Sequence, residues 1–390
     1  MIYYGRHHLD EEDIQAVVNV LKGGALTQGP TIEAFEKALA SYVDAKYAVA
    51  VSSCTAALHL AALAAGVGPG TSLVTSPITF VASANAAFYA GGTPLFVDID
   101  PASVNLCPGR LARTLEEHPE VRAVVPVHFA GLPCDMPAIK KAADKIGAHV
   151  IEDAAHALGS RYPDGRFVGC CAHSLMTTFS FHPVKAISTG EGGMITTNDQ
   201  KIYRRLLRLR SHGINKLDDP LELPEQGKTN GVKDPWYYEM QELGFHYRIT
   251  DIQCGLGLSQ LKKLGKFATR RRELVKKYDS AFANMKNCRP AQVNGRDESA
   301  HHLYVLRINF KQVGLSRQEL IRILLEKNIG SQVHYIPVPM HPYFRKLGFN
   351  PQDYPHSQNY YEEALSIPLY YDLKGEEQNQ IIHAIRELVG

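Results

Sequence analysis

The sequence has little of what would mark a disulfide-rich, membrane-spanning or nucleic-acid-binding protein. Its 390 residues include seven cysteines, none in a Cys-x-x-Cys pair, and Cys170 and Cys171 are adjacent. This usage argues against a disulfide framework and predicts a cytoplasmic protein whose cysteines serve as small apolar side chains. The net charge is only +2, so the composition gives no indication of a nucleic-acid or anionic membrane partner.

Signal peptides, membrane spans and metal-binding patterns are also missing. The N-terminal residues lack the apolar core of a secretory signal peptide. The most apolar stretch, residues 48–67, is interrupted by Ser52, Ser53, Thr55 and His59, which indicates a folded core segment rather than a membrane span. No internal repeat or low-complexity tract is visible. The 17 histidines form no His-x-x-x-His or Glu-x-x-His pattern on a credible helix, so we expect no metal site.

Short apolar strands alternate with helices from residue 47 onward. The predicted strands are 47–51, 72–75, 94–98, 122–127, 149–152, 174–179 and 193–196, and the helices between them include 55–65, 81–90, 135–146 and 199–211. This alternation predicts an α/β fold with a mostly parallel sheet covered by helices on both faces. Ligands bind at the carboxyl ends of the strands in such sheets, so residues that follow different strands are expected to meet there.

The length of the chain exceeds what one ordinary core accommodates, so we expect two domains. Residues 1–264 are predicted to form an N-terminal segment and a large domain, and residues 265–390 a smaller C-terminal α/β domain. Asp10 is expected to cap a first helix. A long helix over residues 250–278 is expected to break near Gly265. Residues 217–236 are rich in proline, glycine and charge and are predicted to be a long surface loop, with an active-site lid as its candidate role.

Lys185 and Asp153 are the most informative pair in the chain. Asp153 ends an apolar strand, and Lys185 lies between Phe181-His182-Pro183-Val184 and a glycine-rich segment. A lysine amine forms a Schiff base with an aldehyde, and a carboxylate can keep a pyridine nitrogen protonated, so the pair predicts a site for pyridoxal phosphate. Most lysines are solvated surface groups, but this apolar context predicts burial, which lowers the lysine pKa.

Several other residues suit the same cofactor, and each also has an ordinary structural explanation. A helix that opens directly after a strand offers amides and hydroxyls to a phosphate, although such hydroxyls are usually N-caps. An aromatic ring can stack on the cofactor ring, although most phenylalanines are core residues, and a histidine near Asp153 can contact the ring oxygen. The candidates are Ser53, Cys54 and Thr55 at the helix start, Ser180 after a strand, Phe80 for stacking, and His156.

Other charged residues and histidines are not expected to take part in the site. Arg270-Arg271-Arg272 is expected to be a solvated helix face, and the side chains of the neighbours His301 and His302 are expected to point in different directions.

Motifs spread over nearly the whole chain resemble those of the DegT/DnrJ/EryC1/StrS family of sugar-nucleotide aminotransferases. They are Leu26-Thr27-Gln28-Gly29-Pro30, Ser53-Cys54-Thr55-Ala56-Ala57-Leu58, Pro77-Ile78-Thr79-Phe80, Glu152-Asp153-Ala154-Ala155-His156, Ser180-Phe181-His182-Pro183-Val184-Lys185, Arg210-Ser211-His212-Gly213, Arg248-Ile249-Thr250-Asp251-Ile252-Gln253 and Gln332-Val333-His334-Tyr335-Ile336-Pro337. The resemblance implies a fold-type I pyridoxal-phosphate aminotransferase that forms a homodimer with a shared active site.

The resemblance also implies roles for individual residues. Lys185 would bind the cofactor covalently and move protons, and Asp153 would pair with its ring nitrogen. The other candidates named above would bind the phosphate, stack on the ring and contact its hydroxyl side. A Gly-x-Asn-x-Arg segment of the family reaches the neighbouring subunit's phosphate, and here it reads Gly244-Phe245-His246-Tyr247-Arg248, with His246 in place of asparagine and Arg248 retained. The expected substrate-side residues are Tyr4, Arg6, Thr27, His212, His334 and Tyr335.

Within the family, the sequence is most similar to the pseudaminic acid branch, on the phrases 77–85, 210–214 and 331–337. That branch transfers an amino group from L-glutamate to C4 of a UDP-linked 4-keto-6-deoxy-N-acetylhexosamine. An aminotransferase acting at C3 or C4 of another nucleotide sugar is an alternative. A related dehydratase is disfavoured, because those relatives carry histidine in place of the lysine. A non-catalytic regulator that binds the cofactor is a further alternative.

Overall fold

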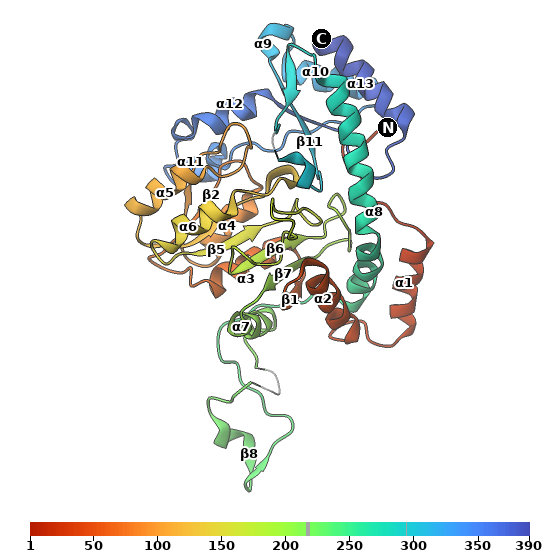
Figure 1. Ribbon diagram of the computed structural model, residues 1–390. Coiled ribbons are helices and arrows are strands. Elements are labelled where there is room, and N and C mark those ends of the chain that lie inside the picture. Colours follow the sequence, from red (N-terminus) through yellow and green to blue (C-terminus); the bar gives the residue numbers. More distant parts are fainter. Residues whose placement is uncertain (216–218, 294) are drawn as a thin grey trace.

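The computed structural model describes residues 1–215, 219–293 and 295–390. Its centre is a seven-stranded sheet in the order β1-β7-β6-β5-β4-β2-β3 (Figure 1). The strands are β1 (Tyr47–Val51), β2 (Ser72–Thr75), β3 (Thr93–Phe96), β4 (Val121–Val125), β5 (His149–Asp153), β6 (Met176–Ser180) and β7 (Gly193–Thr197). β7 is antiparallel to both of its neighbours, and every pairing from β6 to β3 is parallel, which confirms the predicted mostly parallel sheet.

Helices cover both faces of this sheet, each over its own apolar core. One core contains residues of α2, α5, α6 and the first part of α8, and the other contains residues of α3, α4 and α7. The bounds are α1 (Glu11–Lys22), α2 (Pro30–Val43), α3 (Cys54–Ala64), α4 (Val81–Tyr89), α5 (Pro108–Glu117), α6 (Met136–Asp144), α7 (Gln200–Arg210) and α8 (Asp251–Phe282). α5 is not among the helices predicted above, because only Leu111 and Leu115 of its 10 residues are buried.

The first helix begins where the sequence predicts. Asp10 caps α1 by accepting a hydrogen bond from the backbone N–H of Asp13, whose side chain in turn caps Asp10. Two apolar side chains of this helix, Ile14 and Leu21, are 53% and 54% exposed. Part of the surface that α1 exposes is therefore apolar.

The predicted break of the long helix at Gly265 is wrong. α8 is one continuous helix of 32 residues. A glycine inside a helix costs about 1 kcal/mol relative to alanine, and packing on either side of Gly265 outweighs this cost. Leu264 and Phe267 pack in a core of the large domain, whereas Leu274 and Tyr278 pack in the core of the C-terminal part. Figure 1 shows α8 running along one side of the molecule from the large sheet to the smaller domain.

The smaller domain is built on a three-stranded antiparallel sheet in the order β10-β11-β12. Its elements are β10 (Cys288–Pro290), β11 (Tyr304–Ile308), α9 (Phe310–Val313), α10 (Arg317–Glu326), α11 (Pro342–Lys346), α12 (Pro355–Glu363), β12 (Ala364–Ile367) and α13 (Gly375–Val389). Ile2 also packs in this core and pairs with Ile329, so the N-terminal end returns to the C-terminal part. The boundary between residues 264 and 265 stays a prediction.

The segment predicted as a surface loop forms a projecting arm. Its first residues, Leu217 and Asp218, lie outside the described residues, and the rest contains the short hairpin of β8 (Lys228–Thr229) and β9 (Val232–Lys233). The arm extends away from the large sheet, past α7, rather than folding back over it (Figure 1). Four large hydrophobic residues that follow β9 along the chain are 63% to 75% exposed: Trp236, Tyr238, Met240 and Leu243. Within the described ranges, no helix has the length and apolarity needed to cross a membrane.

Candidate active site

Lys185 and Asp153 meet at the carboxyl ends of two adjacent parallel strands. Asp153 is the last residue of β5, and Ser180, five residues before Lys185, is the last residue of β6. Burial lowers the pKa of Lys185 to about 8, although the nearby Cys54 and Asp153 oppose this effect. A partly neutral amine near neutral pH is the form that attacks carbonyl groups. The Cys54 thiol, by contrast, has a raised pKa because it is buried and close to Asp153.

The Asp153 carboxylate is held by two hydrogen-bond donors. The hydroxyl of Ser83 donates to Oδ2 at 2.6 Å, and the backbone N–H of Ala155 donates to Oδ1 at 3.1 Å. Ser83 is fully buried on α4 and was not indicated by any sequence pattern. These two bonds fix the orientation of the carboxylate independently of any ligand.

The preceding residue, Glu152, anchors the end of β5 from the opposite side. Its fully buried carboxylate accepts hydrogen bonds from His128 Nε2 at 2.8 Å, from Ser174 and Thr177, and from Tyr162. Burial favours the neutral acid, but the hydrogen bonds from His128, Ser174 and Tyr162 outweigh burial, so the pKa of Glu152 is lowered. Successive residues of a strand face opposite sides of the sheet, so this network supports the strand that presents Asp153 without occupying the site.

His156 has both ring nitrogens engaged within the protein. Nδ1 accepts the backbone N–H of Ala130 at 3.3 Å, and Nε2 lies 3.0 Å from the Tyr335 hydroxyl. Because Nδ1 is an acceptor, Nε2 carries the hydrogen and donates it to Tyr335. Burial and the positive charge of Lys185 hold the pKa of His156 well below its usual value, so the ring is neutral. Its contact with a cofactor oxygen stays a prediction.

A second histidine, His302, lies beside Lys185 and was missed in the sequence. Its Nε2 is 3.4 Å from Lys185 Nζ, and its ring lies 4.3 Å from that of His156. No local pattern reveals this contact, because the two residues are 117 positions apart. The expected solvation of the 270–272 arginines is wrong for Arg271, which is 5% exposed and donates to the carbonyls of His301 and His302.

Hydroxyl groups gather at the N-terminus of α3. Ser53 caps this helix by accepting the Ala56 N–H at 3.1 Å, and Thr55 lies in its first turn. Ser180 pairs with Gly193 of β7, and a Cβ atom added to Gly193 would lie 2.5 Å from the Ser53 carbonyl oxygen. Glycine therefore lets β7 lie against the start of α3, which places Ser180 near Ser53. Helix amides together with nearby hydroxyls are suited to a phosphate.

Aromatic and substrate-side candidates fall into two groups. Phe80 is 59% exposed at the start of α4, with its ring 6.3 Å from Tyr335, so it is not a core residue. Tyr4 lies 5.5 Å from the ring of His334, and Arg6 and Lys185 line the same small cavity. Phe80, Tyr4, Arg6, His334 and Tyr335 therefore surround the Lys185 region.

Thr27 and His212 form the second group, whose contacts are with other residues. Thr27 is exposed and pairs with Thr250, and the His212 ring lies 5.5 Å from that of His246. Across residues 1–215, 219–293 and 295–390, no hydrogen bond or ring contact joins Thr27 or His212 to Lys185 or Asp153. Their role with substrate stays a prediction.

The 244–248 segment lies against the start of α3 in its own chain. The Tyr247 carbonyl accepts the backbone N–H of Ser52 at 2.9 Å. The Arg248 Nε is buried without a hydrogen-bond partner, and Arg248 lines a cavity of about 470 Å³ together with Arg210. Arg248 thus has an unused donor close to the predicted phosphate region.

These residues fit pyridoxal phosphate. Lys185 offers an amine of lowered pKa to the aldehyde, and Asp153 offers a fixed carboxylate to the ring nitrogen. The α3 N-terminus offers amides and hydroxyls to the phosphate. The buried Nε of Arg248 and Nδ1 of His302 lack hydrogen-bond partners in the protein, as expected for a site that a polar ligand completes.

Comparisons with known proteins agree with this geometry. The chain matches the DegT/DnrJ/EryC1/StrS aminotransferase family over residues 7–386. It is 41% identical to the spore coat polysaccharide biosynthesis protein SpsC of Bacillus subtilis, covering 98% of this chain and 95% of that protein. It is 36% identical to the UDP-4-amino-4,6-dideoxy-N-acetyl-beta-L-altrosamine transaminase of Campylobacter jejuni, covering 96% and 93%.

A solved structure shares the whole architecture. Helicobacter pylori PseC, an aminotransferase of pseudaminic acid biosynthesis, superposes with a TM-score of 0.88 at 29% identity, covering 100% of this chain and 99% of that one. The match confirms the predicted aminotransferase fold with a large and a small domain. Aminotransferases of this family depend on pyridoxal phosphate, the cofactor that the site residues fit. The chain therefore belongs to the DegT/DnrJ/EryC1/StrS family and is a pyridoxal-phosphate-dependent sugar aminotransferase.

Proposed function

We propose that this protein transfers an amino group from L-glutamate to C4 of a UDP-linked 4-keto-6-deoxy-N-acetylhexosamine, as in pseudaminic acid biosynthesis. The observation that carries the proposal is the meeting of Lys185 and Asp153 in a chain that is 36% identical to an altrosamine transaminase over 374 residues. The seven free cysteines and the expected reducing environment support a cytoplasmic location.

In this proposal, separate residues of the chain bind the aldehyde, the ring and the phosphate of the cofactor. Lys185 binds it covalently and Asp153 pairs with its ring nitrogen. Ser83 supports the cofactor indirectly, because its hydrogen bond orients the Asp153 carboxylate. The phosphate contacts are assigned to Ser53, Thr55 and Ser180, with the Cys54 amide beside them, ring stacking to Phe80, and the hydroxyl side to His156.

Bound pyridoxal phosphate supplies an aldehyde that accepts the amino group and a ring that withdraws electrons from the reacting carbon. Lys185 would supply the amine that is displaced and returns, and its Nζ would move the proton between the substrate carbon and the cofactor in each half of the reaction. With a pKa of about 8, roughly one tenth of this amine is neutral at pH 7. The Asp153 carboxylate keeps the ring nitrogen positively charged, which stabilises negative charge that develops during the reaction.

The active site is proposed to be shared between two copies of this chain. The exposed apolar side chains of the arm support this dimer, because Trp236 and Leu243 are 72% and 75% exposed in the single chain. Arg248 and His246 are assigned to the phosphate of the neighbouring subunit. We assign Tyr4, Arg6, His334 and Tyr335 to binding of the sugar nucleotide in the site of their own chain. We assign Thr27 and His212 to binding of the sugar nucleotide that is held in the site of the neighbouring copy.

A second candidate is an amino transfer to C3 or C4 of another nucleotide-linked keto sugar. The 41% identity to SpsC favours it, because that protein is named for spore coat polysaccharide biosynthesis. The two candidates share every cofactor contact and differ in the sugar alone.

The test is incubation of the purified protein with pyridoxal phosphate, L-glutamate and a panel of UDP-linked keto sugars, with mass spectrometry of the products. We expect a product in which the 4-keto-6-deoxy-N-acetylhexosamine carbonyl is replaced by an amine, together with 2-oxoglutarate. Lys185→Ala serves as the inactive control. Amination of a different keto sugar in place of this one supports the second candidate, and binding of the cofactor without any amino transfer refutes both.

A further inference from the structure

His302 makes a contact that the proposed reaction does not yet use. Its Nε2 lies 3.4 Å from Lys185 Nζ, and only 6% of the residue is exposed. Its other ring nitrogen, Nδ1, is buried and has no hydrogen-bond partner. The contact with the lysine is therefore the one hydrogen bond that the His302 ring makes among the described residues.

The direction of this hydrogen bond follows from the protonation of the two groups. Burial, followed by the positive charge of Lys185, holds the pKa of His302 well below its usual value, so its ring is neutral. Lys185, with a pKa of about 8, is mostly protonated at pH 7 and has no lone pair to accept with. Lys185 therefore donates, Nε2 of His302 accepts, and the ring hydrogen is on Nδ1.

We infer that His302 is a positioning residue for the Lys185 amine, which it orients by accepting a hydrogen bond whenever that amine is not joined to the cofactor. This inference rests on the proposed function, because it assigns His302 to the part of the cycle in which Lys185 has been released. The inference adds no covalent step to the proposed amino transfer, because the neutral His302 ring only accepts a hydrogen bond from the Lys185 amine.

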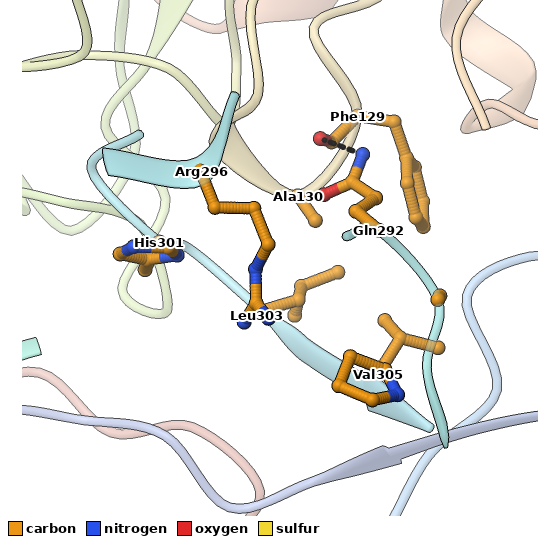
Figure 2. Close-up of a pocket in the computed structure, with 9 residues that line it drawn as sticks. Phe129, Ala130, Gln292, Arg296, His301, Leu303 and Val305 are labelled. Atoms are coloured by element: carbon orange, nitrogen blue, oxygen red, sulfur yellow. Dashed lines mark hydrogen bonds between the residues drawn. The ribbon is translucent and has the colours of Figure 1, made fainter. Parts of the chain in front are cut away.

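The surroundings hold His302 in place for this task. Arg271 donates to the carbonyls of residues 301 and 302 at 3.3 and 3.2 Å, which fixes the backbone, and the His156 ring packs at 4.3 Å. The charged and titratable groups around the pair are Cys54, Asp153, His156, Arg271 and His334. Its neighbour His301 is equally buried but instead lines a separate cavity of about 10 Å³ with Phe129 and Gln292 (Figure 2).

The adjacent histidine supplies a matched control. His302→Phe removes the acceptor and keeps a ring of similar size, and His302→Gln keeps an acceptor at a similar reach. His301→Phe makes the same change at the adjacent position, whose side chain lines the other cavity. Each full-length variant is freed of cofactor, mixed with pyridoxal phosphate, and followed by the visible absorbance of its covalent attachment as a function of pH.

We expect the limiting rate at high pH to fall about tenfold in His302→Phe, because the neutral amine is then poorly oriented. We also expect the midpoint of the pH profile to move below that of the natural protein, since an acceptor that favours the protonated amine is lost. His302→Gln should restore both values, and His301→Phe should leave both unchanged.

The inference is overturned if His302→Phe keeps the limiting rate within about twofold of the natural protein, the scatter expected for a group without a positioning role. It is equally overturned if His301→Phe slows attachment as much. Should His302→Phe fail to fold, His302→Asn carries the same test, because its shorter side chain withdraws the acceptor from Nζ. If the natural protein itself attaches no cofactor, the proposed function fails, which separates that failure from a failure of this inference.

Discussion

At the scale of single residues, the site is set by how burial acts on ionisable groups. Lys185 loses solvation and its pKa falls to about 8, while the neighbouring thiol of Cys54 stays protonated for the same reason. Glu152, on the other face of β5, stays charged because four donors surround it. The end of β5 therefore presents the Asp153 carboxylate to the site, and on its other face the Glu152 carboxylate, whose charge is stabilised by hydrogen bonds.

The lowered lysine pKa predicts the pH dependence of cofactor attachment. Only the neutral amine attacks an aldehyde, so the attachment rate should rise with pH through a midpoint near 8 and then level off. The measurement is the absorbance change on adding pyridoxal phosphate to cofactor-free protein between pH 6 and about 10.5, the upper limit being the ordinary lysine pKa. A rate that is still rising steeply at the top of that range would show that Lys185 is not shifted.

A neutral amide at position 153 should separate binding from catalysis. Asp153→Asn keeps the shape of the side chain but cannot hold the ring nitrogen positively charged, so we expect the cofactor to bind and the amino-transfer rate to fall by about 100-fold or more. Titration with pyridoxal phosphate and steady-state kinetics measure the two effects. Ser83→Ala is the comparison, because it removes one donor to Asp153 and keeps the charge, and it should cost less. Equal losses in both variants would contradict this assignment.

At the scale of elements, strand ends and helix starts place the functional groups. β5 and β6 are adjacent and parallel, so Asp153 and Ser180 end at the same edge of the sheet. The alternating pattern of the sequence predicts this meeting, since the carboxyl ends of parallel strands lie together. The long helix itself was predicted, but its break at Gly265 is wrong, because a glycine in the sequence does not reveal how strongly the helix packs on either side of it.

Two glycines of α8 should respond oppositely to alanine. A Cβ atom at Gly265 would meet no other atom within 4 Å, so Gly265→Ala should raise the free energy of unfolding by about 1 kcal/mol. A Cβ atom at Gly257 would lie 2.7 Å from the Phe35 ring, so Gly257→Ala should lower that free energy by about 1–3 kcal/mol. Denaturant unfolding of both variants checks the pair. A stabilising Gly257→Ala would mean that Phe35 moves aside without cost.

At the scale of the whole molecule, two features of the described chain support the proposed dimer. The arm that projects past α7 carries exposed aromatic and aliphatic side chains, and Arg248 has a buried donor without a partner. The same Arg248 follows Tyr247, whose carbonyl binds Ser52 of its own chain. The chain alone thus leaves two assignments for Arg248, to its own phosphate site or to that of the neighbour.

Mixing two inactive variants distinguishes these assignments. In the proposed homodimer, Lys185→Ala and Arg248→Ala should each inactivate the protein when present in both subunits. If the site is shared, a mixed dimer contains one site with both natural residues, and a statistical mixture should recover about a quarter of the natural activity. Activity after unfolding and refolding the mixture is the measurement, and a mixture of Lys185→Ala with Lys185→Arg is the control. No recovery above that control would assign Arg248 to its own subunit.

The sequence by itself determined the alternating strands and helices, the family and the chemistry that we propose for the Lys185–Asp153 pair. These follow from local patterns: apolar periodicity, a carboxylate at a strand end, and a lysine in an apolar segment. Only the tertiary structure decided that Ser83 and His302 touch this pair and that Arg271 is buried. Such contacts join residues from distant parts of the chain, and their partners are selected by packing, which leaves no periodic trace in the sequence around either residue.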